Sequence, residues 1–134
     1  MNAYTTIEES KQLIEAGLDV NTQDMYYQQC CSMLTGEYKW KPFIGEHLAI
    51  RENLFSYRNG YTMPCWSLAA LLNIIDNNNI VYDICNDKNR DFKILVYDAE
   101  YIKQTLKFYH TENNITDMII WLLEHNYIKS NKNE

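Results

Sequence analysis

Apolar residues near the start of the chain recur with a helical period. Residues 6–16 form one such segment, whose buried face is predicted to consist of Ile7, Leu13, Ile14 and Leu18. Two overlapping Thr-x-x-Glu pairs, at residues 5–8 and 6–9, have the spacing of a capping box. Gly17 follows, and glycine suits the left-handed position after a helix. The segment therefore predicts a first helix.

The end of the chain has the clearest helical pattern. Residues 115–125 carry apolar side chains at positions i, i+3, i+4, i+7 and i+8, namely Ile115, Met118, Ile119, Leu122 and Leu123. Asn113 or Asn114 can cap this helix, and His125 falls at its end. We expect an amphipathic helix here that packs on the rest of the domain, followed by a polar tail over 129–134 that frays.

A third helix is predicted in the middle of the chain, from Pro64 to Asp76. Thr62 can cap it, and Pro64 suits a first helical turn. Its apolar residues cover most of its circumference, as expected for a buried central helix: Trp66, Leu68, Ala69, Leu71, Leu72 and Ile75. The run of residues 76–79, Asp-Asn-Asn-Asn, stops it.

Three short segments that follow are typical of β-strands: Ile80–Cys85, Phe92–Tyr97 and Gln104–His110. The polar links between them, 86–91 and 98–103, are too short for a crossover helix. The segments therefore predict an antiparallel meander.

Two segments have no clear period. Val20–Leu34 begins with turn-forming residues, and we predict a short helix there. Glu37–Tyr61 mixes aromatic residues with proline and glycine, which indicates loops with one or two short strands over Ala49–Tyr57. The elements together predict one α+β domain over 1–134, with N-terminal helices, a small antiparallel meander and a closing C-terminal helix.

Three segments also suggest a family. They read SKQLIEAGLDVNTQDMYY at 10–27, PCWSLAALL at 64–72 and DMIIWLLEHNYI at 117–128. Their order and spacing resemble those of a group of small uncharacterised bacterial proteins that often occur in prophage and other mobile-element regions. The resemblance implies a mobile-element accessory protein, and it carries no catalytic residue across.

Composition narrows the function classes. The chain has 134 residues, 46% of them hydrophobic, and a formal charge of −6. This charge disfavours general attraction to nucleic acid or to an anionic membrane. The longest apolar run, Met118–Leu123, is far shorter than the roughly 20 residues that span a bilayer. With no signal-like N-terminus either, we expect a cytoplasmic protein without membrane association.

The four cysteines are expected to be reduced thiols in that compartment: Cys30, Cys31, Cys65 and Cys85. They show no Cys-x-x-Cys spacing, and Cys30 and Cys31 are adjacent, which is poor geometry for sharing one zinc ion. Cys30 and Cys65 fit small buried hydrophobes better. We therefore predict no metal and no cofactor.

Catalytic motifs are also missing from the sequence. Only His47, His110 and His125 could act as a histidine base, and the last two fit a strand end and a helix end. We therefore predict no catalytic residues and, on balance, no enzyme. A deep pocket joining His47 to Cys65 or to carboxylates would favour the enzyme alternative.

The region Glu37–Tyr61 is the compositional anomaly, because it carries +1 while the other residues carry −7. Aromatic side chains of the kind that protein interfaces favour interleave with its basic residues. A protein partner is the leading hypothesis, single-stranded nucleic acid is the alternative, and homo-oligomers stay open. The interaction candidates are Tyr38, Trp40, Phe43 and Tyr57.

Overall fold

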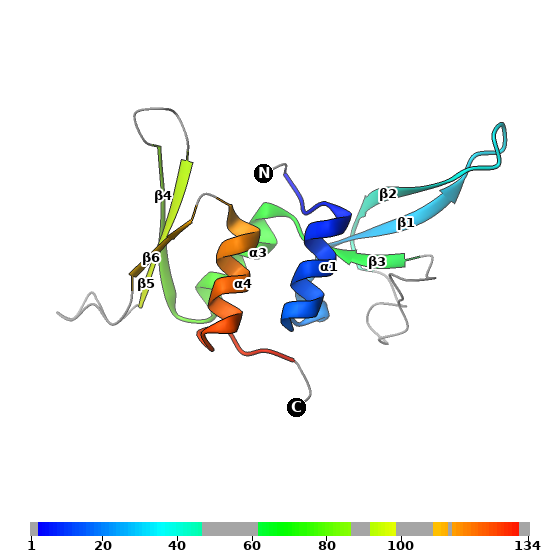
Figure 1. Ribbon diagram of the computed structural model, residues 1–134. Helices are drawn as coiled ribbons and strands as arrows, with labels where there is room; N and C mark the ends of the chain where they lie inside the picture. Colours follow the sequence, from blue (N-terminus) through cyan, green and yellow to red (C-terminus); the bar gives the residue numbers. More distant parts are fainter. Residues whose placement is uncertain (1–2, 47–61, 87–91, 99–108, 113, 132–134) are drawn as a thin grey trace.

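The computed structural model has an α+β fold, as predicted. Its described part contains three α-helices and two three-stranded antiparallel sheets. The helices lie in the middle of an elongated molecule, with one small sheet at each end (Figure 1). The structure describes residues 3–46, 62–86, 92–98, 109–112 and 114–131.

The first helix, α1 (Ile7–Ala16), is confirmed. Of the two overlapping capping boxes, the one at 6–9 forms: the Thr6 hydroxyl accepts from the Glu9 N–H at 3.1 Å, and the Thr6 N–H donates to the Glu9 carboxylate at 2.9 Å. Gly17 ends the helix with a φ of 98°, in the left-handed region. Leu13 and Leu18 are buried, and Ile7 and Ile14 are half-buried.

The closing helix, α4 (Ile115–Glu124), is confirmed as well. Asn114 caps it by accepting a 2.9 Å hydrogen bond from the Thr116 N–H. All five residues of the predicted stripe are buried: Ile115, Met118, Ile119, Leu122 and Leu123. The helical period therefore identified the buried face correctly.

The prediction of a short helix over 20–34 is wrong. A 3-10 turn, η1 (Val20–Thr22), is followed by strand β1 (Met25–Cys31), which pairs with β2 (Tyr38–Ile44) and β3 (Thr62–Cys65) in the order β2-β1-β3. A short helix without a clear apolar face is only marginally stable, whereas pairing with two strands stabilises residues 25–31 as a strand.

The predicted central helix begins later than expected. Residues 62–65 form β3, and α3 (Leu68–Asn77) starts after Ser67, whose hydroxyl accepts from the Ala70 N–H at 3.1 Å. Thr62 and Pro64 therefore belong to a strand, because β1 offers them a partner that the sequence alone did not reveal. The stop at residues 76–79 is confirmed: Asn78 is the C-cap, and Asn79 has a φ of 60°.

The predicted meander is confirmed. Strands β4 (Ile80–Asn86), β5 (Phe92–Asp98) and β6 (Tyr109–Glu112) form an antiparallel sheet in the order β4-β5-β6. Ile94 and Val96 are fully buried. The described part of the third strand starts at Tyr109, and most of its predicted range, 104–108, lies outside the described residues.

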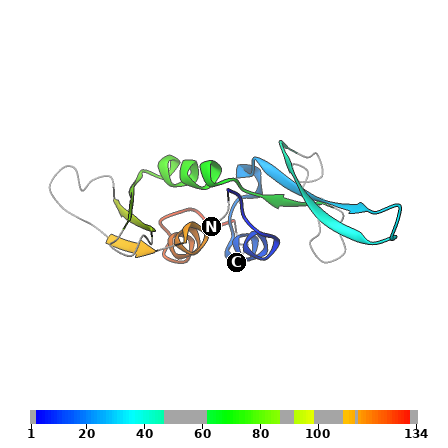
Figure 2. The ribbon, with the colours of Figure 1, turned by 90° about the horizontal axis from the view of Figure 1, so that it is seen from above.

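The main core lies between the helices and the β4-β5-β6 sheet. Figure 2 shows α1 and α4 side by side, with α3 over α4. A second, smaller core lies between α1 and the β2-β1-β3 sheet and consists of Met25, Tyr27, Met63 and Cys65. This smaller core anchors the base of the β1–β2 hairpin to the body of the molecule.

Candidate functional site

The β1–β2 hairpin, residues 25–44, projects from the body of the molecule (Figure 1). Its strands pair over their full length, from Met25 opposite Ile44 to Cys31 opposite Tyr38. β3 pairs only with the stretch from Met25 to Gln28. The distal half of the hairpin therefore has no third strand among the described residues.

The turn of the hairpin is held by its own backbone. The Ser32 N–H donates to the Glu37 carbonyl at 2.8 Å, and the Gly36 N–H donates to the Ser32 carbonyl at 2.8 Å. The Ser32 hydroxyl also accepts a bond from the Leu34 N–H at 3.3 Å. Gly36 has a φ of 71°, which other residues adopt rarely. The sequence thus specifies an ordered turn.

Two large apolar side chains at this turn are exposed to solvent. Met33 is 100% exposed and Leu34 is 98% exposed. Single exposed apolar residues are common on protein surfaces, whereas Met33 and Leu34 are adjacent and lie together at the turn of the projecting hairpin. We call residues 32–36 the hairpin tip.

The structure separates the sequence-predicted candidates between two faces of β2. Side chains alternate along a strand, so Tyr38 and Trp40 lie on one face and Phe43 lies on the other. Phe43 stacks on Tyr26 of β1, with ring centroids 5.5 Å apart. Tyr57 lies outside the described residues, as do the strands predicted over Ala49–Tyr57.

The face that carries Tyr38 and Trp40 continues the buried face of the smaller core. Trp40 is half-buried and packs against that core, while Tyr38, nearer the tip, is 63% exposed. Ile44, at the other end of the strand, is 88% exposed. Tyr38, Trp40 and Ile44 thus form an apolar stripe along one face of β2, and of these three only Trp40 is packed against the smaller core.

Sequence reasoning missed the most exposed residues of this surface, Met33 and Leu34. The segment Ser-Met-Leu-Thr-Gly at 32–36 stands between two runs rich in aromatic residues, which is the signature of a hairpin with a short loop. Interpreting 20–34 as a helix concealed that signature.

Cys65 is fully buried and bonds to the backbone and side chain of Thr5. Its sulfur lies 3.5 Å from the Thr5 carbonyl oxygen and 3.6 Å from the Thr5 hydroxyl. Burial raises the pKa of the Cys65 thiol to about 11. Such a thiol remains protonated at neutral pH and is a poor nucleophile. His47, the candidate base for this thiol, lies outside the described residues.

The other cysteines differ in exposure. Cys30 is half-buried, while Cys31 and Cys85 are exposed, and none of the four cysteines forms a disulfide. Cys30 and Cys31 occupy successive positions of β1, so their side chains point to opposite faces of the hairpin. Within the described residues, no group of three or more His, Cys, Asp and Glu side chains could hold a metal ion.

Two of the three histidines lie in described elements. The His125 ring stacks on Trp121, with centroids 4.2 Å apart, and its Nδ1 lies 2.9 Å from the Trp121 carbonyl oxygen. His125 is thus the C-cap of α4, which agrees with its predicted place at the helix end. The backbone of His110 lies in β6, opposite Val96.

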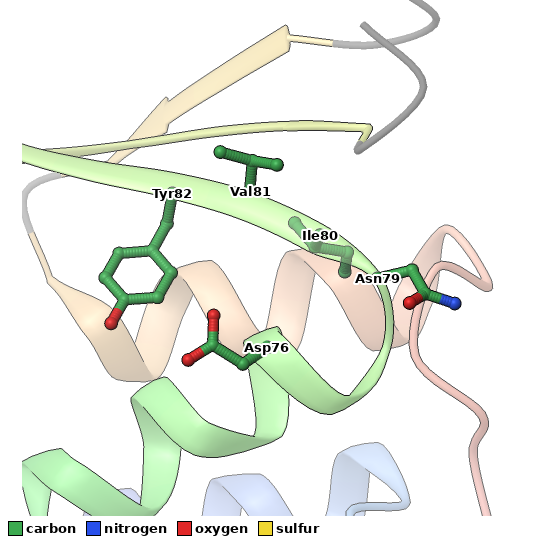
Figure 3. A pocket seen from close by; sticks show the side chains of 5 residues that line it. All are labelled: Asp76, Asn79, Ile80, Val81 and Tyr82. Atoms are coloured by element: carbon green, nitrogen blue, oxygen red, sulfur yellow. The ribbon is translucent and has the colours of Figure 1, made fainter. Parts of the chain in front are cut away.

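An open hollow of about 460 Å³ lies where α3 turns into β4 (Figure 3). The Tyr82 ring and the carboxylate of Asp76 lie on the same side of the strand, and Val81 lies on the other side. Asn79 and Ile80 complete the described lining. This lining offers one carboxylate and one phenol, without a cation or thiol, which is a poor set for catalysis.

In comparisons with known proteins, no protein-family model, no curated protein and no solved structure matches this chain. Among the described residues, no helix is long and apolar enough to cross a membrane.

Proposed function

We propose that this protein is a non-enzymatic interaction protein that binds a protein partner through the β1–β2 hairpin. The observation that carries the proposal is the almost complete exposure of Met33 and Leu34 on a turn held by backbone hydrogen bonds. A partner that covers this tip removes two large apolar side chains from water.

The expected gain from such burial is substantial. Fully burying a leucine or methionine side chain contributes about 1.5–3 kcal/mol. The turn is already ordered by the bonds of Ser32 and Gly36, so little conformational entropy is lost when a partner binds. Tyr38 adds an exposed aromatic ring behind the tip, and tyrosine is a preferred interface residue.

The described residues offer less support for catalysis than for binding. The one buried thiol, Cys65, has a raised pKa, and the hollow beside Asp76 is open and lined by few reactive groups. A mobile-element origin and a cytoplasmic location stay predictions.

A photo-crosslinking amino acid at position 34 tests the proposal. The matched control carries the same amino acid at position 84, because Ile84 is also apolar and 51% exposed but lies on β4 at the other end of the molecule. With a lysate of the native host, we expect a specific protein adduct from position 34 that position 84 does not give.

A second variant distinguishes specific binding from non-specific crosslinking. In a pull-down without the photo-crosslinking amino acid, the double variant Met33→Ser and Leu34→Ser should recover at least tenfold less of the same protein than the wild-type chain does. Equal adducts from positions 34 and 84, unchanged recovery by the double variant, or binding of phosphatidylserine vesicles in place of a protein would each contradict the proposal.

A further inference from the structure

β2 is an edge strand with a largely exposed surface. In the part of the chain that the structure describes, β2 pairs only with β1, at the end of the order β2-β1-β3. Tyr38, Lys39, Lys41, Phe43 and Ile44 are all exposed. An edge strand of this kind presents backbone groups to which another chain can add.

The register identifies those backbone groups. The Ser32 N–H donates to the Glu37 carbonyl, and the Gly45 N–H donates to the Asp24 carbonyl, so these two pairs bond across the hairpin. In an antiparallel pair, the direction of the N–H and C=O groups alternates from one residue to the next. Consequently Tyr38, Trp40, Pro42 and Ile44 direct their backbone groups away from β1.

Pro42 limits the length of this free edge. Proline has no N–H, and Pro42 occupies an outward position, so the ladder with β1 is intact while the outer edge lacks one donor. An uninterrupted set of outward donors and acceptors therefore remains only at Tyr38 and Trp40. A strand that adds here would be short.

The side chains beside this edge are sorted by charge. Lys39 and Lys41 lie on one face of β2, about 7 Å apart, and Tyr38 and Trp40 lie on the other. Neither lysine forms an ion pair with another described residue. The hairpin carries two lysines and one glutamate, while the rest of the chain carries −7.

We propose that the outer edge of β2 accepts, over Tyr38–Lys41, an extended segment of a partner protein in which acidic and apolar residues alternate. This inference rests on the proposed function and names the chemistry of the partner. Backbone bonds to Tyr38 and Trp40 supply affinity, as in other cases of strand addition. Acidic side chains meet Lys39 and Lys41, and apolar side chains meet the aromatic face.

The same features disfavour a second copy of this chain as the occupant. Pairing β2 with β2 of another copy brings lysines of both copies onto the same face of the ladder, where like charges destabilise it. Pro42 shortens such a pairing at both ends. Pairing of β2 with β2 of a second copy is thus disfavoured, whereas addition of an acidic strand is favoured.

Synthetic peptides test this inference directly. The probe is a capped peptide of alternating glutamate and valine, and the control is a peptide of equal length with lysine in place of glutamate. In an amide-resolved NMR titration, we expect the acidic peptide to shift the Tyr38 and Trp40 amides. The basic peptide should bind at least tenfold more weakly.

Variants locate the interaction and give a gain of binding. Lys39→Glu with Lys41→Glu should reverse the preference between the two peptides, whereas Lys93→Glu, an exposed control on β5, should leave it unchanged. Pro42→Val supplies the missing N–H and should tighten binding of the acidic peptide severalfold.

Three results would overturn strand addition: no binding of the acidic peptide, equal binding of both peptides, or displacement of the acidic peptide by a single-stranded oligothymidylate at equal concentration. If the peptide fails while position 34 still crosslinks to a protein, the proposed function stands and only the binding mode is wrong. If both fail, the hairpin is not the binding element.

Discussion

The phenol of Tyr27 donates a 2.7 Å hydrogen bond to the backbone carbonyl of Thr5, 22 residues earlier in the chain. Thr5 directly precedes the cap of α1, and its hydroxyl also accepts from the Trp66 N–H at 3.1 Å and lies 2.8 Å from the Ser10 hydroxyl. This bond ties the base of the β1–β2 hairpin to α1. The stability of the projecting hairpin therefore depends on a buried polar contact.

Tyr27→Phe should weaken this attachment without creating a cavity. Loss of one buried hydrogen bond is expected to lower the free energy of unfolding by about 1 kcal/mol. Urea unfolding measures the change, with Tyr38→Phe as the control because Tyr38 is largely exposed. An equal effect of both substitutions would show that the Tyr27 hydroxyl has no special role.

Cys65 predicts a dependence of stability on alkaline pH. Burial raises its pKa from the ordinary 9.0 to about 11 in the folded protein, so the folded state binds the proton more tightly than the unfolded state. The corresponding stability is present below pH 9.0 and is lost as the pH rises toward about 11. Burial also raises the pKa of Tyr27, which adds to the loss at the highest pH.

Urea unfolding across this pH range measures the effect, and Cys65→Val should show a shallower decline than the wild-type protein. At pH 8.0, within about a unit of an ordinary thiol pKa, Cys31 and Cys85 should react with a thiol reagent much faster than Cys65. Equal reactivity of all four cysteines would contradict the burial of Cys65.

Asp24 and Ser67 form a second long-range connection, between the start of β1 and the start of α3. The Ser67 N–H donates to the Asp24 carboxylate at 2.8 Å, and the Ser67 hydroxyl bonds to the same carboxylate while it caps the helix. Ser67→Ala should cost about 1–2 kcal/mol of stability, because it removes the cap and one bond to Asp24.

A double-mutant cycle with Asp24→Ala tests whether the two residues act together. If the two residues act together, the losses of stability from the two single substitutions should add up to about 0.5 kcal/mol or more above the loss from the double substitution. Strictly additive effects in chemical denaturation would mean that the cap works without the carboxylate.

Truncation should lower stability strongly in the core and hardly at all at the hairpin tip. Leu122→Ala on α4 removes a fully buried side chain and should cost about 2–5 kcal/mol of stability. Leu34→Ala removes an exposed side chain and should change stability by less than about 0.5 kcal/mol. Thermal unfolding separates the two. A large loss from Leu34→Ala would indicate that the tip is covered in the folded protein.

The elements that the sequence predicted correctly are those determined by residues close together in the chain. The stripe of α4 and the capping box of α1 are set by residues within a few positions of one another, and the three strands of the meander follow one another in the chain. Each of these signals lies within a short window of sequence.

The strands that were missed depend on distant partners. β1 is completed by β3, which begins about thirty residues after the end of β1, and only Met25 and Tyr27 show the alternation that would reveal a half-buried strand. Pro64 was interpreted as the first turn of a helix because nothing nearby in sequence shows that β1 lies beside it.

The candidate site was predicted in part. Residue type alone selected Tyr38, Trp40 and Phe43, but the alternation of β2 places Phe43 on the opposite face. Met33 and Leu34 carry no chemical signature in the sequence, and only the projection of the hairpin gives them significance.

Amide hydrogen exchange of the protein, alone and with the partner captured through position 34, tests the central claim most directly. The proposed function predicts slower exchange over the hairpin, with the largest change between Ser32 and Lys41, and unchanged exchange in β4 and β5. Slower exchange confined to the β4-β5-β6 sheet or to α4 would contradict it and would move the binding surface to the other end of the molecule.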